Sequence, residues 1–203
     1  RVVYPRPDLL YAANFLNMMF DSPVLPYKLD PDIVHALNVF WILHADHEQN
    51  CSTSAVRSVG SSQVDPFSAV SAGIAALYGP LHGGANEMAR EMLKEITKDV
   101  GEKGTGTKAV DDGMQKAFDT KRKLMGFGHR VYKNGDHRAP ILHKLGRDMA
   151  SRDKNNPGGH GATKWFELGE QVQKIMLEKK NIHPNVDFPC GLTYFTMGIP
   201  VPQ

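Results

Sequence analysis

The sequence has few of the features that mark a secreted, membrane-bound or metal-binding protein. Cys51 and Cys190 are its two cysteines in 203 residues, and their separation fits neither a metal motif nor a redox motif. We therefore expect no disulfide and an intracellular, reducing compartment. No apolar run approaches the roughly 18 residues of a membrane-spanning helix, and residues 1–5 do not resemble a signal or transit peptide. A membrane partner is therefore not expected.

An excess of one charge is also missing. Lys and Arg number 24 against 22 for Asp and Glu, so the formal net charge is +2, and aromatic residues make up 8% of the chain. The basic run Lys121–Lys123 has no base-stacking aromatic residues around it. We expect this run to be solvated surface, and nothing in the composition indicates a nucleic-acid partner.

The sequence is rich in the apolar periodicity that is typical of helices. Apolar residues make up 41% of the chain and recur at spacings of three and four, whereas the alternation typical of strands is almost absent. Asp30-Pro31 and Asp65-Pro66 each resemble a helix N-cap followed by a first-turn proline. The patterns predict an all-α fold with helices over 8–20, 31–44, 66–77, 85–96, 110–118, 141–149 and 165–176, and with loops at 101–106 and 155–161.

One histidine lies on a Gly/Pro turn directly before a strongly periodic helix. Residues 79–87 read GPLHGGANE, which places His82 at the helix N-terminus. Unpaired N–H groups and the positive end of the helix dipole disfavour a second proton on its imidazole, so we expect a neutral hydrogen-bond donor. Such a donor suits the oxygen of an enolising carbonyl. The alternative is a histidine that caps a buried turn.

Three further strings gather chemically reactive side chains. Residues 126–133 put His129 in a glycine-rich turn, with Arg138 shortly after it. Residues 184–188 put Asp187 ahead of a short apolar helix, and residues 44–50 hold His44 and His47. Joining an acetyl thioester to a ketone needs a base for the methyl group, a donor for the enolate-like oxygen and a group that polarises the ketone. One aspartate and two histidines supply groups of these types.

Taken in their order along the chain, which is 44–50, 79–87, 126–133 and 184–188, these four strings resemble citrate synthase. The resemblance runs from Pro5 to the last residue. It implies a citrate-synthase-like, multi-helical fold with a cleft between two domains, and a homodimer. Residues 1–82 would form the C-terminal part of the large helical domain. Residues 83–198 would form the small domain on the coenzyme A side of the cleft, and residues 199–203 would start the return to the large domain.

The resemblance also implies roles for individual residues. By their positions in the motifs, His82 hydrogen-bonds the acetyl-CoA enol oxygen, His129 polarises the oxaloacetate carbonyl and Asp187 removes the methyl proton. Positions that bind oxaloacetate fall on His44, His47 and Arg138. Positions that bind coenzyme A fall on Leu124, Met125, Gly126, Phe127, Gly128, Asn185 and, near its phosphates, Lys133. Acetyl-CoA is then a co-substrate, and no permanently bound cofactor is expected.

The two histidines of residues 44–50 also have a metal-binding interpretation. His44 and His47 are three residues apart and are flanked by acidic residues. The zinc-hydrolase pattern instead has histidines four residues apart with a glutamate directly after the first. We therefore expect substrate binding here and no metal.

Two residues and the chain ends depart from the family pattern. His137 stands where the family has a proline, so we expect Arg138 to be held less rigidly. Pro189 follows Asp187 closely, and we expect it to change where the next helix starts and to tilt Asp187. The family's two other substrate arginines lie beyond the position of Gln203, and one normally comes from the second subunit. On this interpretation the chain is truncated and its site is incomplete.

The expected function is therefore an acyltransferase reaction of the tricarboxylic acid cycle. Acetyl-CoA, oxaloacetate and water would give citrate and coenzyme A. One alternative keeps this chemistry and uses propionyl-CoA or a longer acyl-CoA, giving 2-methylcitrate or an alkylcitrate. Another is a non-catalytic paralogue that binds coenzyme A or a protein, and a third is a helical scaffold without a site. Cytoplasm, mitochondrial matrix and peroxisome are all compatible with the sequence.

Overall fold

The structure is a computed structural model that describes residues 2–100, 107–152 and 162–200. Within these ranges the regular secondary structure is helical, and the one extended pairing is an isolated antiparallel bridge between Phe127 and Pro184. The all-α prediction is confirmed. None of the helices in the described ranges has both the length and the apolarity needed to cross a membrane. The predicted loops at 101–106 and 155–161 lie outside the described residues.

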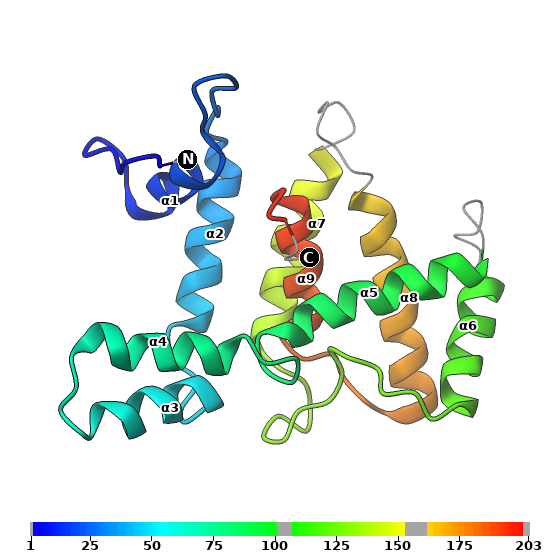
Figure 1. Ribbon diagram of the computed structural model, residues 1–203. Helices are drawn as coiled ribbons and strands as arrows, with labels where there is room; N and C mark the ends of the chain where they lie inside the picture. The colour runs from blue at the N-terminus through cyan, green and yellow to red at the C-terminus, as the bar shows by residue number, and fades with distance from the viewer. Residues whose placement is uncertain (1, 101–106, 153–161, 201–203) are drawn as a thin grey trace. The chain divides into compact units, whose positions relative to one another are not determined.

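The helices fall into two compact units, Arg1–Asp46 and His47–Gln203. The first unit holds α1 (Tyr11–Phe20) and α2 (Pro31–His44). The second holds α3 (Cys51–Gly60), α4 (Pro66–Leu77), α5 (Gly84–Val100), α6 (Thr107–Asp119), α7 (Arg138–Arg152), α8 (Ala162–Lys180) and α9 (Asp187–Thr196) (Figure 1). The predicted domain boundary after residue 82 differs from this division and stays a prediction.

Two helix starts follow directly from local sequence. Asp30 accepts a hydrogen bond from the backbone N–H of Asp32, and Asp65 accepts one from the N–H of Ser68 at 3.1 Å. In each case a proline occupies the first helical position, where its missing N–H is not needed. Both predicted N-caps are confirmed.

Helix α3 was not predicted. Asn50 caps it by accepting a hydrogen bond from the Thr53 N–H at 2.9 Å. None of its residues is buried, and serine and threonine occupy four of its ten positions, so the apolar residues Val56 and Val59 form only a short stripe. The N-cap at Asn50 was a second local signal.

Helix α1 begins three residues later than predicted. The backbone N–H of Arg6 donates to Asn14 Oδ1, and Asn14 Nδ2 donates to the Arg6 carbonyl. The Leu9 N–H closes a turn onto the same carbonyl at 3.3 Å. These bonds hold residues 6–9 in a turn, so the helix starts only at Tyr11.

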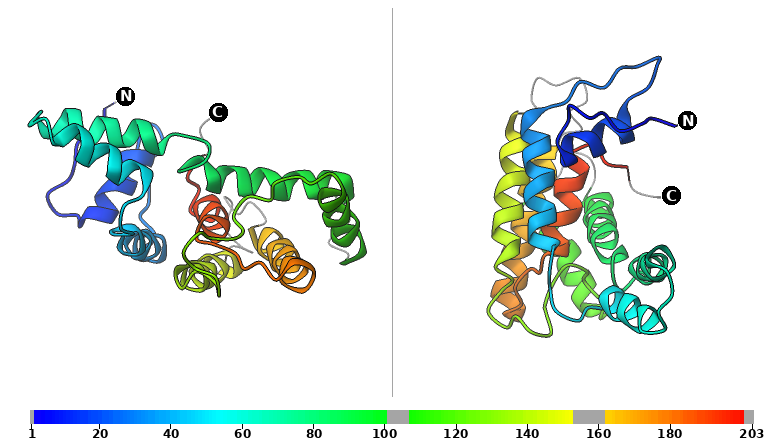
Figure 2. Two further views of the ribbon diagram at one scale, coloured as in Figure 1. Left: turned by 90° about the horizontal axis from the view of Figure 1, so that it is seen from below. Right: turned by 90° about the vertical axis from the view of Figure 1, so that its left-hand side faces the viewer.

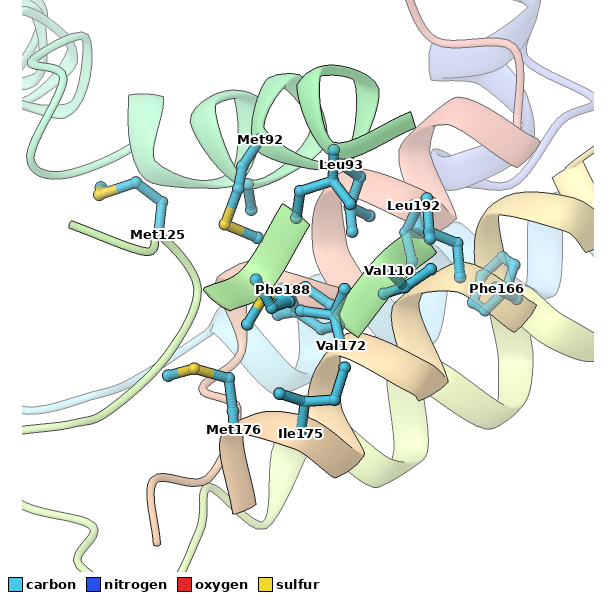
Figure 3. Packing of buried hydrophobic residues seen from close by; sticks show 14 of the residues in the cluster. Met92, Leu93, Val110, Met125, Phe166, Val172, Ile175, Met176, Phe188 and Leu192 are labelled. Carbon is cyan, nitrogen blue, oxygen red and sulfur yellow. The ribbon is translucent and has the colours of Figure 1, made fainter. Parts of the chain in front are cut away.

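The main hydrophobic core lies in the second unit and joins helices α5, α6, α7, α8 and α9 (Figure 3). Met92 and Leu93 of α5 point toward Phe188 and Leu192 of α9, with Val110 of α6 between the helices. Its buried members are Ala85, Ala89, Met92, Leu93, Ile96, Val110, Met114, Met125, Ala150, Ala162, Phe166, Leu168, Val172, Ile175, Met176, Phe188 and Leu192. The predicted apolar faces of α6 and α8 are therefore core-facing.

Neither Cys51, which is exposed, nor the buried Cys190 forms a disulfide, as expected.

Helix α7 buries a face about one position away from the predicted one. Leu142 and Gly146 are buried, whereas Ile141 is 46% exposed. Gly146 allows Phe166 and Thr193 to approach so closely that a Cβ there would lie 2.5 Å from each. Of the predicted residues Met149 is buried, but close helix packing selects a small residue at position 146, so the stripe of large apolar residues marks the buried face only in part.

Helices α3 and α4 lie side by side and antiparallel (Figures 1 and 2). The predicted apolar stripe of α4 exists but is not covered by the described residues. Phe67 is 85% exposed and Ile74 62% exposed, and Val70 and Leu77 lie open beside them. We call these four residues the α4 face.

Candidate active site

His82 lies in a hydrogen-bonded turn two residues before α5. The turn closes through the Gly83 N–H to the Leu77 carbonyl at 2.8 Å and the His82 N–H to the Gly79 carbonyl at 3.0 Å. A Cβ at Gly83 would lie 2.5 Å from that Leu77 oxygen, so the tight turn requires glycine. The prediction of a histidine just before the helix N-terminus is confirmed.

The ring of His82 is held by the start of α3. Its Nε2 lies 3.0 Å from the hydroxyl of Ser52 and 3.4 Å from the Ser52 backbone N–H. The Ser52 hydroxyl also lies 2.8 Å from Oδ1 of Asn50, the N-cap of α3. The unpredicted helix α3 therefore orients a predicted catalytic histidine, and its Nε2 is committed to Ser52 while Nδ1 remains for a ligand.

His129 follows a loop in which two glycines adopt left-handed conformations, with φ +82° at Gly126 and φ +75° at Gly128. Its Nδ1 accepts hydrogen bonds from the backbone N–H groups of Val131 at 3.0 Å and Tyr132 at 3.2 Å. A nitrogen that accepts two bonds carries no proton, so the ring proton lies on Nε2. His129 is thus arranged as a neutral donor.

Electrostatics favour the same state. Burial lowers the pKa of His129 below its ordinary value and outweighs the opposing charge of Asp136. Near neutral pH the imidazole therefore stays uncharged, and Nε2–H can donate to a carbonyl oxygen.

Asp187 occupies the first helical position of α9. Burial raises the pKa of its carboxyl to about 6, an effect that the positive charge of Arg138 partly opposes. A carboxylate with a pKa near 6 is a stronger base than an exposed aspartate and is still ionised at neutral pH. Asp187 therefore combines the charge state and the basicity that a proton abstractor needs.

Asn185 links His129 to Asp187. Its backbone N–H donates to the Gly126 carbonyl at 2.9 Å, and its Nδ2 donates to the Gly128 carbonyl at 2.8 Å. Its Oδ1 accepts a bond from the Asp187 N–H at 3.0 Å. The residue before His129 and the residue that carries the carboxylate are thus tied to one side chain.

A close contact completes this junction. A Cβ at Gly126 would lie 2.8 Å from the Cβ of Phe188, in the first turn of α9. Nearby, Gly191 of α9 packs so closely on α5 that a Cβ would lie 2.5 Å from the Asn86 carbonyl. The helix after His82, the loop before His129 and the helix of Asp187 therefore meet at glycine contacts.

A buried ion pair stands beside Asp187. The guanidinium of Arg138 donates to both carboxylate oxygens of Asp136, from Nε at 3.0 Å and from Nη2 at 2.8 Å. Asp136 also accepts from the backbone N–H groups of Arg138 and Val186. Burial alone would raise the pKa of Asp136, but these hydrogen bonds outweigh it and hold the pKa below its ordinary value. The pair connects the start of α7 to the residue before Asp187.

The two histidines of residues 44–50 fall in different units. His44 ends α2 in the first unit, where its Nδ1 lies 2.8 Å from the Phe40 carbonyl. His47 begins the second unit, and its ring lies 5.4 Å from that of His129, edge to face. Its Nε2 lies 3.1 Å from the hydroxyl of Tyr132. The structure therefore brings two of the predicted oxaloacetate-handling histidines, His47 and His129, together.

The predicted coenzyme A segment presents mainly its backbone. Met125 is buried in the core, and Leu124 and Phe127 pack against it. The Phe127 ring lies 4.6 Å from that of Phe188, whereas Lys133 is exposed. The backbone of Gly126 and Gly128 is hydrogen-bonded to Asn185 and His183, so within this segment the structure shows packing and backbone pairing.

Comparison with known proteins decides the family. The model for the citrate synthase C-terminal domain family matches residues 1–203. Citrate synthase 1 of Mycobacterium tuberculosis is 44% identical over 201 residues, which cover 98% of this chain and 44% of that protein. The chain belongs to the citrate synthase family.

Solved citrate synthases share its fold. The Pyrobaculum aerophilum enzyme superposes with a TM-score of 0.79 at 38% identity, covering 98% of this chain and 46% of that one. Citrate synthase from Thermoplasma acidophilum, solved as a ternary complex with carboxymethyl coenzyme A and oxaloacetate, gives 0.79 at 32% identity, covering 97% and 48%. The chain thus spans less than half the length of these citrate synthases.

Both departures from the citrate synthase pattern have a structural account. Asp136 accepts hydrogen bonds from the Arg138 backbone N–H and from the Nε–Nη2 edge of its guanidinium, so Arg138 is held without a proline at position 137. Pro189 is the third residue of α9, where backbone N–H groups have no partner within the helix. Helix α9 starts at Asp187 with the proline in place.

Several residues of this candidate site have roles that sequence reasoning missed. Ser52 holds His82, the Asn185 side chain joins two motifs, and Asp136 anchors Arg138. The N-cap signal of Asn50 was available for Ser52, and Asp136 lies two residues before Arg138, whereas Asn185 contacts a residue 57 positions away. Among the described residues, no group of three His, Cys, Asp or Glu side chains could hold a metal ion.

Proposed function

We propose that the protein carrying this chain condenses acetyl-CoA with oxaloacetate and hydrolyses the product to citrate and coenzyme A. The observation that carries the proposal is the junction around Asn185. There a carboxylate with a pKa of about 6 and a neutral, donor-ready histidine are held by one side chain. This reaction would place the protein in the tricarboxylic acid cycle.

Asp187 performs the first step. Its carboxylate takes a proton from the acetyl methyl group, and the C–H electron pair forms the enol double bond while the thioester oxygen gains electron density. His82 donates a hydrogen bond from Nδ1 to that oxygen. This tautomer requires Nε2 to be an acceptor. The donor that faces it is the backbone N–H of Ser52, because the single proton of the Ser52 hydroxyl goes to Oδ1 of Asn50. Simultaneous stabilisation of the oxygen is needed because a carboxylate is a weak base toward a methyl group.

His129 acts in the second step. Its Nε2–H hydrogen-bonds to the ketone oxygen of oxaloacetate. When the enolate carbon attacks the ketone carbon, that oxygen takes the Nε2 proton and becomes the hydroxyl of citryl-CoA, and the proton held by Asp187 balances the one that His129 gives up. Water then attacks the thioester carbonyl and releases coenzyme A as the leaving thiol. Arg138 and His47 are proposed to hold the substrate carboxylates, with Nη1 as the guanidinium nitrogen that Asp136 does not use. His44 is proposed as a further oxaloacetate ligand.

The Thermoplasma acidophilum structure supports the substrate classes, because that citrate synthase holds carboxymethyl coenzyme A and oxaloacetate. In this chain the coenzyme A site is proposed to comprise the backbone of residues 124–128, with Asn185 and the exposed Lys133 beside it. Acetyl-CoA enters as a co-substrate, and no permanently bound cofactor takes part.

A homodimer is proposed as the working assembly. The α4 face exposes several large apolar side chains on one helix, and such patches on soluble proteins mark protein–protein contacts. A second copy of the chain presents the same patch, which is the requirement for a two-fold symmetric interface.

Thiol release tests the reaction directly. We would supply the full-length protein with acetyl-CoA or propionyl-CoA, each with and without oxaloacetate. Oxaloacetate-dependent release is expected, with a fall of at least about a hundredfold in Asp187→Ala. Asp148→Ala, which removes an exposed carboxylate paired with Lys144, is the matched control and should retain activity.

The acyl substrate and the alternatives are read from the same assay. A larger rate with propionyl-CoA would replace citrate by 2-methylcitrate as the product. No release from a folded protein would overturn catalysis and leave a paralogue that binds without turnover. Equal rates in Asp187→Ala and the unaltered protein would remove Asp187 from the mechanism.

A further inference from the structure

Tyr132 contacts two histidines of the predicted oxaloacetate site, His47 and His129. Its hydroxyl lies 3.1 Å from Nε2 of His47, and its backbone N–H donates to Nδ1 of His129 at 3.2 Å. Its ring lies 4.7 Å from the His129 ring and 6.1 Å from that of His137. No mechanistic step described above uses this side chain.

The backbone of Tyr132 makes one of these contacts, the hydrogen bond to His129, and its side chain makes the others. The backbone N–H sets the tautomer of His129 and would do so with any residue at position 132 except proline. The ring packs against His129 at an interplanar angle of 33°, and only the hydroxyl reaches His47. A change of the side chain therefore leaves the His129 tautomer in place and tests the rest.

We infer that Tyr132 is a positioning residue of the oxaloacetate site, acting through His47. The phenol hydroxyl donates to Nε2 of His47, which leaves the ring proton on Nδ1. His47 then presents a neutral N–H donor to the dicarboxylate, in a ring orientation set by the phenol. This inference rests on the proposed condensation reaction, because it names the residue that organises the dicarboxylate half of that site.

The geometry gives this pairing a physical reason. A neutral imidazole has two tautomers, and the partner of one nitrogen decides which face donates. His47 and His129 lie edge to face 5.4 Å apart, and Tyr132 contacts both rings. Because His47 follows the end of α2 on a segment without helical hydrogen bonds, the phenol supplies an anchor that its own backbone does not.

The experiment compares Tyr132→Phe and Tyr132→Leu in the full-length protein. Phenylalanine keeps the ring and removes the hydroxyl. The KM for oxaloacetate should rise about threefold to tenfold, while kcat and the KM for acyl-CoA stay within about twofold. Leucine also removes the ring beside His129, so kcat should fall as well. Tyr4→Phe, at an exposed tyrosine outside the site, is the matched control.

A spectroscopic readout tests the positioning role without turnover. The ¹⁵N shifts of the His47 ring report which nitrogen carries the proton. They should show an Nδ1–H tautomer in the unaltered protein and a mixture of tautomers in Tyr132→Phe, with His129 unchanged. An unchanged His47 signal in Tyr132→Phe would overturn the inference whatever the activity.

The outcomes separate the two proposals. Absence of oxaloacetate-dependent thiol release from the unaltered protein contradicts the condensation reaction, and the His47 signal still decides the role of Tyr132. An active protein whose Tyr132→Phe variant keeps its KM for oxaloacetate contradicts the inference alone. Equal increases in the KM for oxaloacetate and the KM for acyl-CoA would also contradict the inference. They would indicate a general loss of structure and not a change in the oxaloacetate site.

Discussion

Burial gives Asp187 its chemical character. The carboxyl lies at the start of a helix whose next six residues are buried, and its pKa rises to about 6. The raised pKa is also a stability effect, because the folded protein holds the proton more tightly than the unfolded chain, whose pKa is near 3.8. Between these two pH values the folded state binds more protons, so stability falls as the pH rises toward 6.

Asp187→Asn should therefore be more stable than the unaltered protein at pH 7, by about 1–3 kcal/mol, because it removes the burial of a charge. The advantage should shrink by about 1.4 kcal/mol between pH 7 and pH 5, where the folded aspartate becomes protonated. Urea unfolding at the two pH values measures both quantities. Asp148→Asn, on the exposed surface, should show no such pH dependence. A pH-independent advantage for Asp187→Asn would contradict the raised pKa.

At the scale of single residues, sequence reasoning found His82 and Asp187 because each stands next to a helix start, which is a local feature. It missed Ser52 and the side chain of Asn185. Their roles come from contacts with residues 30 and 57 positions away. A single sequence carries no direct signal for such pairs.

At the scale of elements, the junction between the 126–128 loop and α9 depends on the absence of a side chain. Gly126 combines a left-handed φ of +82° with a backbone that approaches Phe188. Gly198 has a similar φ of +76°, but a Cβ there would have nothing within 4 Å. Substitutions at the two glycines can therefore distinguish the effect of backbone strain from that of a steric clash.

Gly198→Ala should destabilise the protein by roughly 1 kcal/mol, the cost of a left-handed alanine. Gly126→Ala should cost at least about 2 kcal/mol more, since the new Cβ collides with Phe188, and it should lower turnover because α9 carries Asp187. Denaturant unfolding and thiol release measure the two effects. Equal destabilisation by both substitutions would mean that the loop moves away from α9 freely.

The elements also show where periodicity succeeds and where it fails. Helix α8 buries Leu168, Val172 and Ile175 as predicted, because its stripe consists of large apolar residues. Helix α7 packs through Gly146, and α3 buries nothing, so hydropathy gave a shifted face for one and no helix for the other. Small residues and N-caps carry packing information that apolar periodicity does not contain.

At the scale of the whole molecule, the α4 face is the feature that the described residues leave unexplained within one chain. Three apolar side chains on it are more than half exposed, at 85%, 62% and 51%. A second copy would remove them from water, which is worth on the order of 1.5–3 kcal/mol for each fully buried side chain.

Ile74→Glu in the full-length protein should convert a dimer into monomers, because the carboxylate would be placed in an apolar interface. Ile141→Glu makes the same change at a 46% exposed isoleucine on α7 and should leave the mass unchanged. Analytical ultracentrifugation measures the mass of each variant. If both variants keep the mass of the unaltered protein, the α4 face is not the dimer interface.

The sequence by itself determined the helical class, the N-caps of α2 and α4, and the order of the reactive residues along the chain. These features depend on neighbours within a few positions, and they were readable for that reason. Only the tertiary structure decided which ring nitrogens of His47 and His82 have partners, how the Asp136–Arg138 pair is joined to Val186 and why the pKa of Asp187 is raised. Those properties arise where Asp136 meets Val186 and His47 meets Tyr132, at separations of 50 and 85 residues. Burial and hydrogen-bond geometry at such contacts exist only after the chain has folded.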